Sequence, residues 1–156
     1  MGVATFGSGA TLGGNDGADV AISSDGQALT LSLAEMEAVV DAGKSPDLIA
    51  ARVFSAVVPV DGADDGVDIA FAVDAFASVT EGASADAVLS VNGQTAVQHF
   101  SAGTFESFVQ QLSFKGGATK LCHLAVVAVV QRDPAYPDAA ATLRPLTIDA
   151  EIQPSG

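Results

Sequence analysis

Hydrophobic and polar positions alternate with a period of two along much of the chain. The clearest run is residues 67–79, VDIAFAVDAFASV, in which every odd position is apolar while Asp68, Asp74 and Ser78 occupy even positions. This alternation predicts a strand with one face in a core and the other face toward water or a neighbouring molecule.

Three more segments predict long strands. They are ARVFSAVVPV (51–60), TKLCHLAVVAVVQ (119–131) and TLRPLTIDAEI (142–152). The second is almost continuously apolar, as expected of a strand that is buried on both faces or covered at an interface. In the third, Pro145 has no N–H to donate to a ladder, which places part of that strand at a sheet edge or a bulge.

Two turn signals predict hairpins. Ser24-Asp25-Gly26 separates DVAIS from QALTLSL, and Asn92-Gly93 separates ADAVLSV from QTAVQHF. Asp-Gly and Asn-Gly favour tight turns because both residues tolerate the backbone conformations that these turns require.

Two segments fit a helix or a strand. Residues 32–43 carry Ser32 and Glu35 at capping-box spacing and Gly43 at a position that ends helices, so we favour one short helix there over a bulged strand. Residues 104–114 place apolar side chains at helical spacing and also in alternation, and their Phe content favours a strand.

The predicted elements define an all-β, mainly antiparallel fold. About eight or nine strands separated by turns, without βαβ alternation, indicate a β-sandwich or jelly roll. Residues 1–18 contain six glycines, and we interpret them as an extended N-terminal arm that lies on another surface. Residues 19–156 are then a single β-sandwich domain.

The charge balance restricts the partners of the protein. Among 156 residues, 19 are acidic and six are basic, for a net charge of −13, and the basic residues are scattered singly. Nucleic acid and anionic membrane surfaces require clustered positive charge, so neither is an expected partner. The longest apolar run, LAVVAVV, is too short for the roughly 18 residues of a membrane-inserted helix.

The hydrophobic content suggests association between copies. The chain is 49% hydrophobic with a mean hydropathy of +0.39, which is high for an acidic protein and indicates surface buried in a homo-oligomer or against other assembly subunits. The start, MGVATFGSGATLGG, has neither a basic nor an apolar segment, so we expect no signal peptide in this form, although one could have been removed before residue 1. We expect a virion, cell-surface or extracellular location rather than a cytoplasmic one.

A series of segments resembles a known class of proteins. VAISSDGQALTLSL, then AGKSPD, a strand ending VVPVDG, then FAVDAFASVTEGASADAVLSV and finally LTIDAEI are similar to small secreted β-sandwich proteins of unknown function. The resemblance spans residues 19–152 and implies a sandwich. It implies no activity and no functional residue. Those proteins carry paired cysteines and a signal, whereas this chain has a single cysteine, Cys122.

The stretch DGADDGVD (61–68) is the richest source of metal ligands. Asp61, Asp64, Asp65 and Asp68 offer the carboxylate oxygens that Ca²⁺ prefers, with loop carbonyls to complete its shell. The spacing is not that of an EF-hand. The alternative interpretation is a solvated hairpin connection between two strands, which we favour because turns accommodate aspartate. Calcium is the one cofactor that this sequence suggests.

Catalytic signals are weak. Cys122 and His123 are adjacent, so on a strand they point to opposite faces, while His99 in a neighbouring strand is placed to approach either one. The stretch KLCHLAV favours a buried thiol at Cys122 over a reactive one. Sugar binding usually uses stacking aromatic residues, and the chain has no Trp and a single Tyr, Tyr136, which disfavours a carbohydrate module.

Three functions follow from these observations, in order of preference. The first is a non-enzymatic structural subunit that self-associates into a capsid, decoration, appendage or surface-layer assembly. The alternative is a small calcium-dependent binding module. A hydrolytic enzyme that uses His99 comes third.

Overall fold

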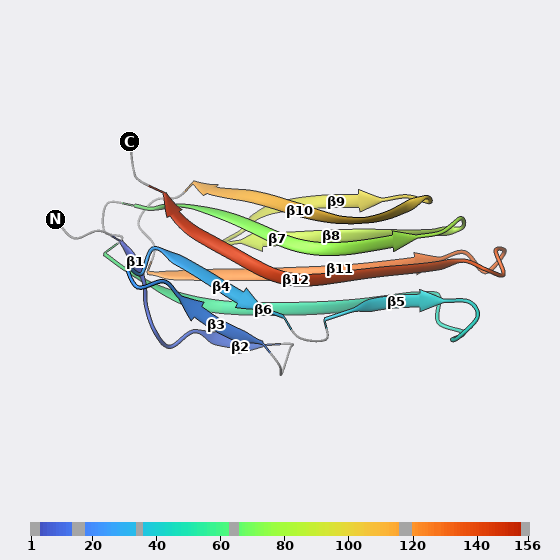
Figure 1. The fold of residues 1–156 in the computed structure, drawn as a ribbon, viewed down its shortest axis with the longest axis horizontal. Coiled ribbons are helices and arrows are strands. Elements are labelled where there is room, and N and C mark those ends of the chain that lie inside the picture. Colours follow the sequence, from blue (N-terminus) through green and yellow to red (C-terminus); the bar gives the residue numbers. More distant parts are fainter. Residues whose placement is uncertain (1–3, 14–17, 34–35, 63–65, 116–119, 154–156) are drawn as a thin grey trace.

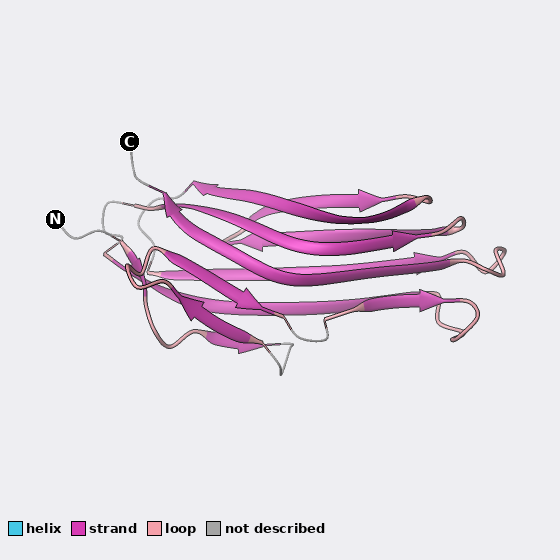
Figure 2. Ribbon diagram, in the orientation of Figure 1, coloured by secondary structure: helices cyan, strands magenta, loops and turns pink. Residues whose placement is uncertain are grey.

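The computed structural model describes residues 4–13, 18–33, 36–62, 66–115 and 120–153, which form two antiparallel β-sheets packed face to face. Figure 1 shows the two layers with their strands along the long axis, and Figure 2 shows that the described elements are strands. The predicted all-β sandwich is therefore confirmed. Among these residues no helix has the length and apolarity that a membrane span requires.

Each sheet has six strands. The first sheet, which we call sheet I, has the order β1-β6-β11-β8-β9 with β2 also on β6, and sheet II has the order β10-β7-β12-β4-β3 with β5 also on β12. The strands of sheet I are β1 (Thr5–Phe6), β2 (Thr11–Gly13), β6 (Ile49–Asp61), β8 (Ala83–Val91), β9 (Gln94–Phe100) and β11 (Leu121–Arg132). The strands of sheet II are β3 (Asp19–Ile22), β4 (Ala28–Ser32), β5 (Ala38–Asp41), β7 (Asp68–Val79), β10 (Thr104–Lys115) and β12 (Ala140–Gln153).

Alternating burial along the strands builds the core. In β7 the residues from Ile69 to Val79 at odd positions are buried and those between them are partly exposed. β6, β8, β11 and β12 alternate in the same way over most of their length. Each sheet thus has an inner face, sealed against the other sheet, and an outer face whose residues share the opposite parity.

The structure resolves the two ambiguous segments. Residues 104–114 lie in strand β10, as predicted. The short helix favoured at 32–43 is wrong where the segment is described, because Ser32 ends β4 and 38–41 form β5. Ala38 and Val40 are buried while Val39 between them is exposed, so the period of two prevails over the capping signal at this edge of sheet II.

Both predicted hairpins are confirmed. β3 pairs with β4 across the Asp25 turn, and β8 pairs with β9 across Asn92-Gly93. Asn92 has a φ of 45°, the left-handed conformation that this turn requires. At the first turn the Ser23 hydroxyl donates to Asp25 Oδ1 at 2.6 Å, as does the N–H of Gln27 at 3.0 Å, and the two bonds lower the pKa of Asp25.

The hairpin predicted at residues 61–68 is wrong. β6 ends at Asp61 in sheet I, while β7 begins at Asp68 in sheet II. β6 instead pairs with β11, β1 and β2, and β7 pairs with β10 and β12. Both sides of each strand are thus paired with other strands. The chain therefore changes from sheet I to sheet II between β6 and β7. The bulge predicted near Pro145 is present in β12, between Pro145 and Thr147.

The described part of the N-terminal segment joins the two sheets. Phe6 is buried in the core, and its N–H donates to the carbonyl of Gly26 in the β3–β4 turn at 2.7 Å. The next residue, Gly7, donates to the carbonyl of Pro59 in β6 at 2.8 Å. A Cβ on Gly7 would lie 2.9 Å from Asp61 Oδ2, so a larger residue here would displace the Asp61 side chain.

Gln110 joins the sheets at the opposite side. It is the one buried polar side chain among the described residues, and it points inward from β10. Its Nε2 donates to the carbonyls of Ala87 at 3.1 Å and Ala96 at 3.0 Å, which belong to β8 and β9. A satisfied buried amide of this kind fixes the relative position of the elements it connects.

The turn between β7 and β8 gives a test of this packing. Gly82 has a φ of 84°, and a Cβ there would overlap the ring of Tyr136, whereas Gly93 has a φ of 87° and open space around it. We expect Gly93→Ala to lower the free energy of unfolding by about 1–2 kcal/mol, the cost of a left-handed alanine. Gly82→Ala should cost about 1–3 kcal/mol more because of the overlap, as measured by urea unfolding. If the two variants are equally stable, Tyr136 does not pack on this turn.

Candidate ligand-binding face

The outer face of sheet II combines a hollow, polar side chains and an exposed aromatic ring. Its floor comes from the even positions of β7, which lies between β10 and β12 and pairs with both along its whole length. The register places Gln111, Ala72 and Asp149 side by side across these three strands, with Thr30 of β4 next in line. Residues distant in the sequence thus form one surface.

The hollow is a shallow groove of about 310 Å³. Its floor is made of small side chains, because Ala28, Ala70 and Ala72 stand where larger residues would fill it. Polar side chains line it from β10, β4 and β12, and these are Gln111, Ser113, Thr30, Asp149 and Glu151. Apolar contact area therefore lies between hydrogen-bonding groups on two sides, as is typical of small-ligand sites.

Hydrogen bonds position two of the carboxylates on this face. Thr30 Oγ1 donates to Asp149 Oδ1 at 2.7 Å, and Thr147 Oγ1 donates to Asp74 Oδ2 at 3.1 Å. Each carboxylate keeps a second oxygen with lone pairs toward solvent. The side chains of Gln111 and Glu151 make no hydrogen bond within the described part of the chain. The face thus offers several acceptors to a ligand, and the Gln111 amide adds donors.

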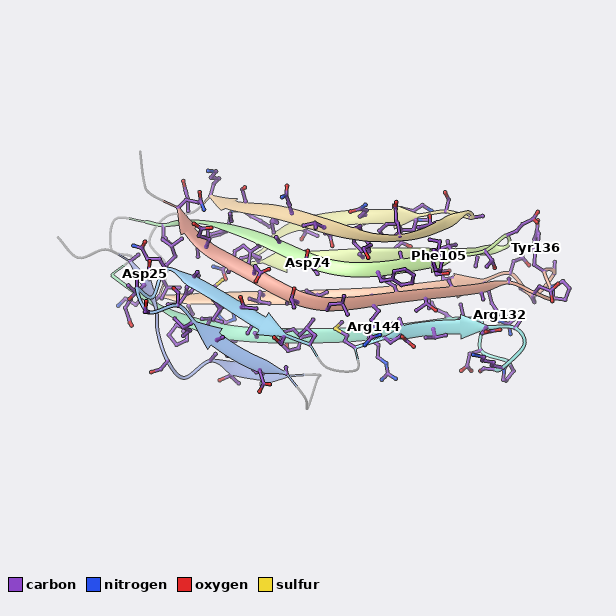
Figure 3. The ribbon with its side chains drawn as sticks, in the orientation of Figure 1. Asp25, Asp74, Phe105, Arg132, Tyr136 and Arg144 are labelled. Carbon is purple, nitrogen blue, oxygen red and sulfur yellow. The ribbon has the colours of Figure 1, made fainter. Side chains whose placement is uncertain are left out.

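An exposed aromatic pair lies farther along the same face. Phe105 of β10 is 78% exposed, and its ring meets that of Phe76 edge to face with centroids 5.1 Å apart. Figure 3 shows Phe105, Asp74 and Arg144 on the near side of the sandwich, which is the outer side of sheet II. Covering this exposed ring with another molecule lowers the free energy, because apolar surface leaves water. Phe76 restricts the position of the Phe105 ring.

The charge of this face favours some ligands over others. Asp68, Asp74, Asp149 and Glu151 lie at outward positions of β7 and β12, against Lys115 and Arg144 at outward positions of β10 and β12. Lys115 Nζ is 3.5 Å from Asp68 Oδ2, so one cation is already paired. The net negative charge of this face repels an anionic ligand but does not repel a neutral one.

A larger hollow of about 680 Å³ lies where β5 approaches the end of β6. Two acids and two bases line it, namely Glu37, Asp47, Arg52 and Arg144. Arg52 Nε donates to the backbone carbonyl of Glu37 at 3.3 Å, which uses part of its guanidinium in holding the wall. No aromatic side chain lines this hollow, and its charges balance, so it offers less to recognise a ligand than the face of Phe105 does.

The predicted calcium ligands are described in part. Asp61 and Asp68 stand at the two ends of the connection between β6 and β7, and Asp64 and Asp65 lie outside the described residues. Within the described part of the chain no three His, Cys, Asp or Glu side chains converge as metal ligands would. The calcium site therefore stays a prediction. Asp68 is two residues from Ala70 in the groove floor, so a cation bound there would lie beside the groove.

The three residues considered for catalysis are not brought together. His99 lies on β9, with Nδ1 2.7 Å from Asp86 Oδ1 on β8. His123 faces outward from β11, which β8 separates from β9. Its backbone N–H donates to Asn92 Oδ1 at 2.7 Å. Cys122 points inward and is buried, as predicted, and burial raises the pKa of its thiol to about 11. A protonated thiol of this kind is a poor nucleophile.

Sequence analysis missed Phe105 and the groove. Phe105 sits in a segment that the sequence predicts as an ordinary strand, and the sequence argument on sugar binding rests on Trp and Tyr alone. The alternation in β10 contained a usable signal, because Phe105 shares parity with the polar Ser107, Gln111 and Ser113. An aromatic residue at a polar-face position of a strand is a candidate for ligand contact.

Comparisons with known proteins found no match by sequence and solved structures of low similarity. No family model matches the chain, and no curated protein matches its sequence. A structure of TmCBM61 in complex with β-1,4-galactotriose matches with a TM-score of 0.39 and 13% identity over 95% of this chain and 90% of that chain. The CBM22-1 xylan-binding domain of Paenibacillus barcinonensis Xyn10C matches with a TM-score of 0.27 and 14% identity over 99% and 95%.

Likeness at these TM-scores carries no conclusion about what this chain binds. The predicted resemblance to small secreted β-sandwich proteins likewise extends no further than the sandwich, because no family model supports it. The class of protein that the fold defines is a β-sandwich domain.

Burial of Cys122 predicts a pH dependence of stability. Its thiol ionises near pH 8.5 in the unfolded chain but, with a pKa of about 11, stays protonated in the fold. The unfolded state therefore loses a proton first, so stability is full below pH 8.5 and falls as pH rises toward 11. Between pH 7.5 and 10.5 we expect wild type to lose about 2–3 kcal/mol more than Cys122→Ala in urea unfolding. Equal losses in both proteins would contradict this.

Proposed function

We propose that this protein is a non-catalytic binding module that takes a neutral, hydroxyl-rich ligand, such as a stretch of glycan, on the outer face of sheet II. The observation that carries this proposal is the alignment of an alanine-floored polar groove with an exposed aromatic ring on one sheet. The proposal rests on this surface and on its chemistry.

The hydrogen-bonding groups of the groove match hydroxyl groups. Asp149 and Glu151 are acceptors, and Gln111, Ser113 and Thr30 both donate and accept. A ligand that satisfies them must supply many donors together with acceptors, as a row of sugar hydroxyls does. The negative charge of the face disfavours phosphate and carboxylate ligands, which leaves neutral sugars as the best match.

The aromatic pair supplies the apolar part of recognition. Sugar rings have one face of C–H groups, which can cover an aromatic ring and remove it from water. Phe105 presents such a ring at 78% exposure, and its edge-to-face contact with Phe76 reduces the conformational freedom that binding would otherwise cost. Phenylalanine thus serves here although the chain lacks Trp.

The size of the face favours an oligosaccharide over a monosaccharide. Phe105 and Gln111 are six residues apart on β10, which corresponds to about 20 Å along the strand. One or two sugar rings do not reach from the groove to the aromatic pair. A longer chain contacts both.

The three functions predicted from the sequence relate to this proposal in different ways. The calcium-dependent module remains testable, because Asp68 adjoins the groove, and each binding measurement is therefore made with calcium and again with EDTA. The self-assembling subunit concerns a different surface. Hydrolysis by His99 has no described nucleophile at hydrogen-bond distance, and His99 bonds to Asp86 on sheet I.

Removing the aromatic ring tests the binding face. We expect Phe105→Ala to raise the Kd for a neutral oligosaccharide by about tenfold to a hundredfold, because it removes most of the apolar contact. Calorimetry should first use galactan and xylan oligosaccharides, with polygalacturonate as the anionic comparison. Leu48→Ala is the control, since Leu48 is 44% exposed just before β6, outside the groove and the aromatic pair. Equal affinity of Phe105→Ala and wild type would place binding elsewhere.

The length of the face predicts how affinity depends on chain length. Affinity should rise steeply from the monosaccharide to the oligosaccharide that reaches Phe105, and then level off. In Phe105→Ala the rise should stop at the length that fills the groove alone. Full affinity for a monosaccharide would show that the groove acts without the aromatic pair.

A further inference from the structure

The outer face of sheet I has an apolar centre and few charged residues. The register of four adjacent strands aligns one valine from each into a row that crosses the sheet. The row consists of Val97 (β9), Val88 (β8), Val127 (β11) and Val53 (β6). Its end members, Val97 and Val53, are 65% and 52% exposed. Small and apolar residues continue the face on both sides, with Val129 and Ala51 on one side and Ala125 and Ser55 on the other.

This face differs from the rest of a strongly acidic molecule. Between residues 51 and 131 the outward positions of β6, β8, β9 and β11 carry two acidic residues, Asp86 and Asp61 at the end of β6, and neither Lys nor Arg. Asp86 is itself bonded to His99 at 2.7 Å. The whole chain carries a net charge of −13, so charge that would keep two copies apart has been kept off this surface.

The dimensions of the face are those of a stable interface. The four strands contain 7 to 13 residues each, and at the usual spacings they cover about 650 Å². A standard interface buries about 800 Å² on each partner. Solvent-exposed valines in a row across such an area are costly in water, and their burial would provide the main driving force for association.

The pattern is also complementary to itself. A two-fold axis that lies in the plane of the interface and runs between β8 and β11, parallel to them, brings Val97 onto the second copy's Val53 and Val88 onto the second copy's Val127. Asp86 then meets the second copy's Val129 and not the second copy's Asp86. Each pair of positions meets reciprocally, as in an isologous contact.

We propose that the outer face of sheet I is the interface of a two-fold homodimer. The outer face of sheet II then points away from the partner on both copies, so the dimer presents two binding faces to solvent. Two linked faces raise the avidity for a polymer without any new contact between protein and ligand. The interface itself is independent of whether the proposed ligand is correct.

Light scattering after size-exclusion chromatography tests the dimer in the absence of ligand. The chain has a mass of 15.5 kDa, and we expect twice that mass at high micromolar concentration, with dissociation on dilution. Added NaCl should tighten the dimer, because it screens the negative charge of both copies without weakening apolar contact. A monomer at all concentrations and salt levels overturns the proposal.

Matched substitutions locate the interface. Val53→Lys should raise the dimer Kd at least tenfold, because it buries an unpaired ammonium group. Val109→Lys is the control, since Val109 on sheet II is 51% exposed against 52% for Val53, and it should dimerise like wild type. Val97→Lys repeats the test from β9, and circular dichroism establishes which variants are folded. A folded Val53→Lys or Val97→Lys protein with unchanged Kd, or a Val109→Lys monomer, overturns the assignment.

Discussion

The pairing of β7 with β10 on one side and β12 on the other is the constraint from which the remaining structure follows. Twelve consecutive residues of β7 are paired with β10, and the β12 ladder accompanies them with a single bulge. A strand held on both sides has no freedom to rotate, so its odd positions must enter the core and its even positions must form the outer face. Sheet I repeats this arrangement around β11, which β6 and β8 flank.

Two connections of different chemistry hold the sheets in place relative to each other. Phe6 and Gly7 bridge the β3–β4 turn and β6 through backbone bonds at one side. Gln110 reaches from β10 to the carbonyls of β8 and β9 at the other side, close to the ring contact between Phe100 and Phe108. The middle of the core consists largely of valine, alanine and leucine, which pack without directional bonds. Directional contacts at the margins therefore complement non-directional packing in the centre.

The two outer faces have opposite chemistry although they share one architecture. Sheet II carries carboxylates, an amide, a groove and an exposed aromatic ring, whereas sheet I carries a row of valines and two aspartates, one of them at the end of β6. If both outer faces of a sandwich are exposed only to solvent, charged side chains are expected on both of them. The proposed recognition of a polar ligand on one face and the proposed association through the other would together account for this difference.

Local pattern and tertiary context determined different parts of this protein. The sequence by itself determined the all-β class, the parity of β7, the Asp25 and Asn92-Gly93 hairpins and the burial of Cys122, because these depend on neighbours in the chain. Tertiary structure decided that 38–41 form a strand and that the segment from Asp61 to Asp68 passes between sheets, because strand partners distant in the sequence impose both. It also decided which outward residues become neighbours. Phe105 and Phe76, or Val97 and Val53, meet or align only through the register of separate strands, which no local pattern encodes.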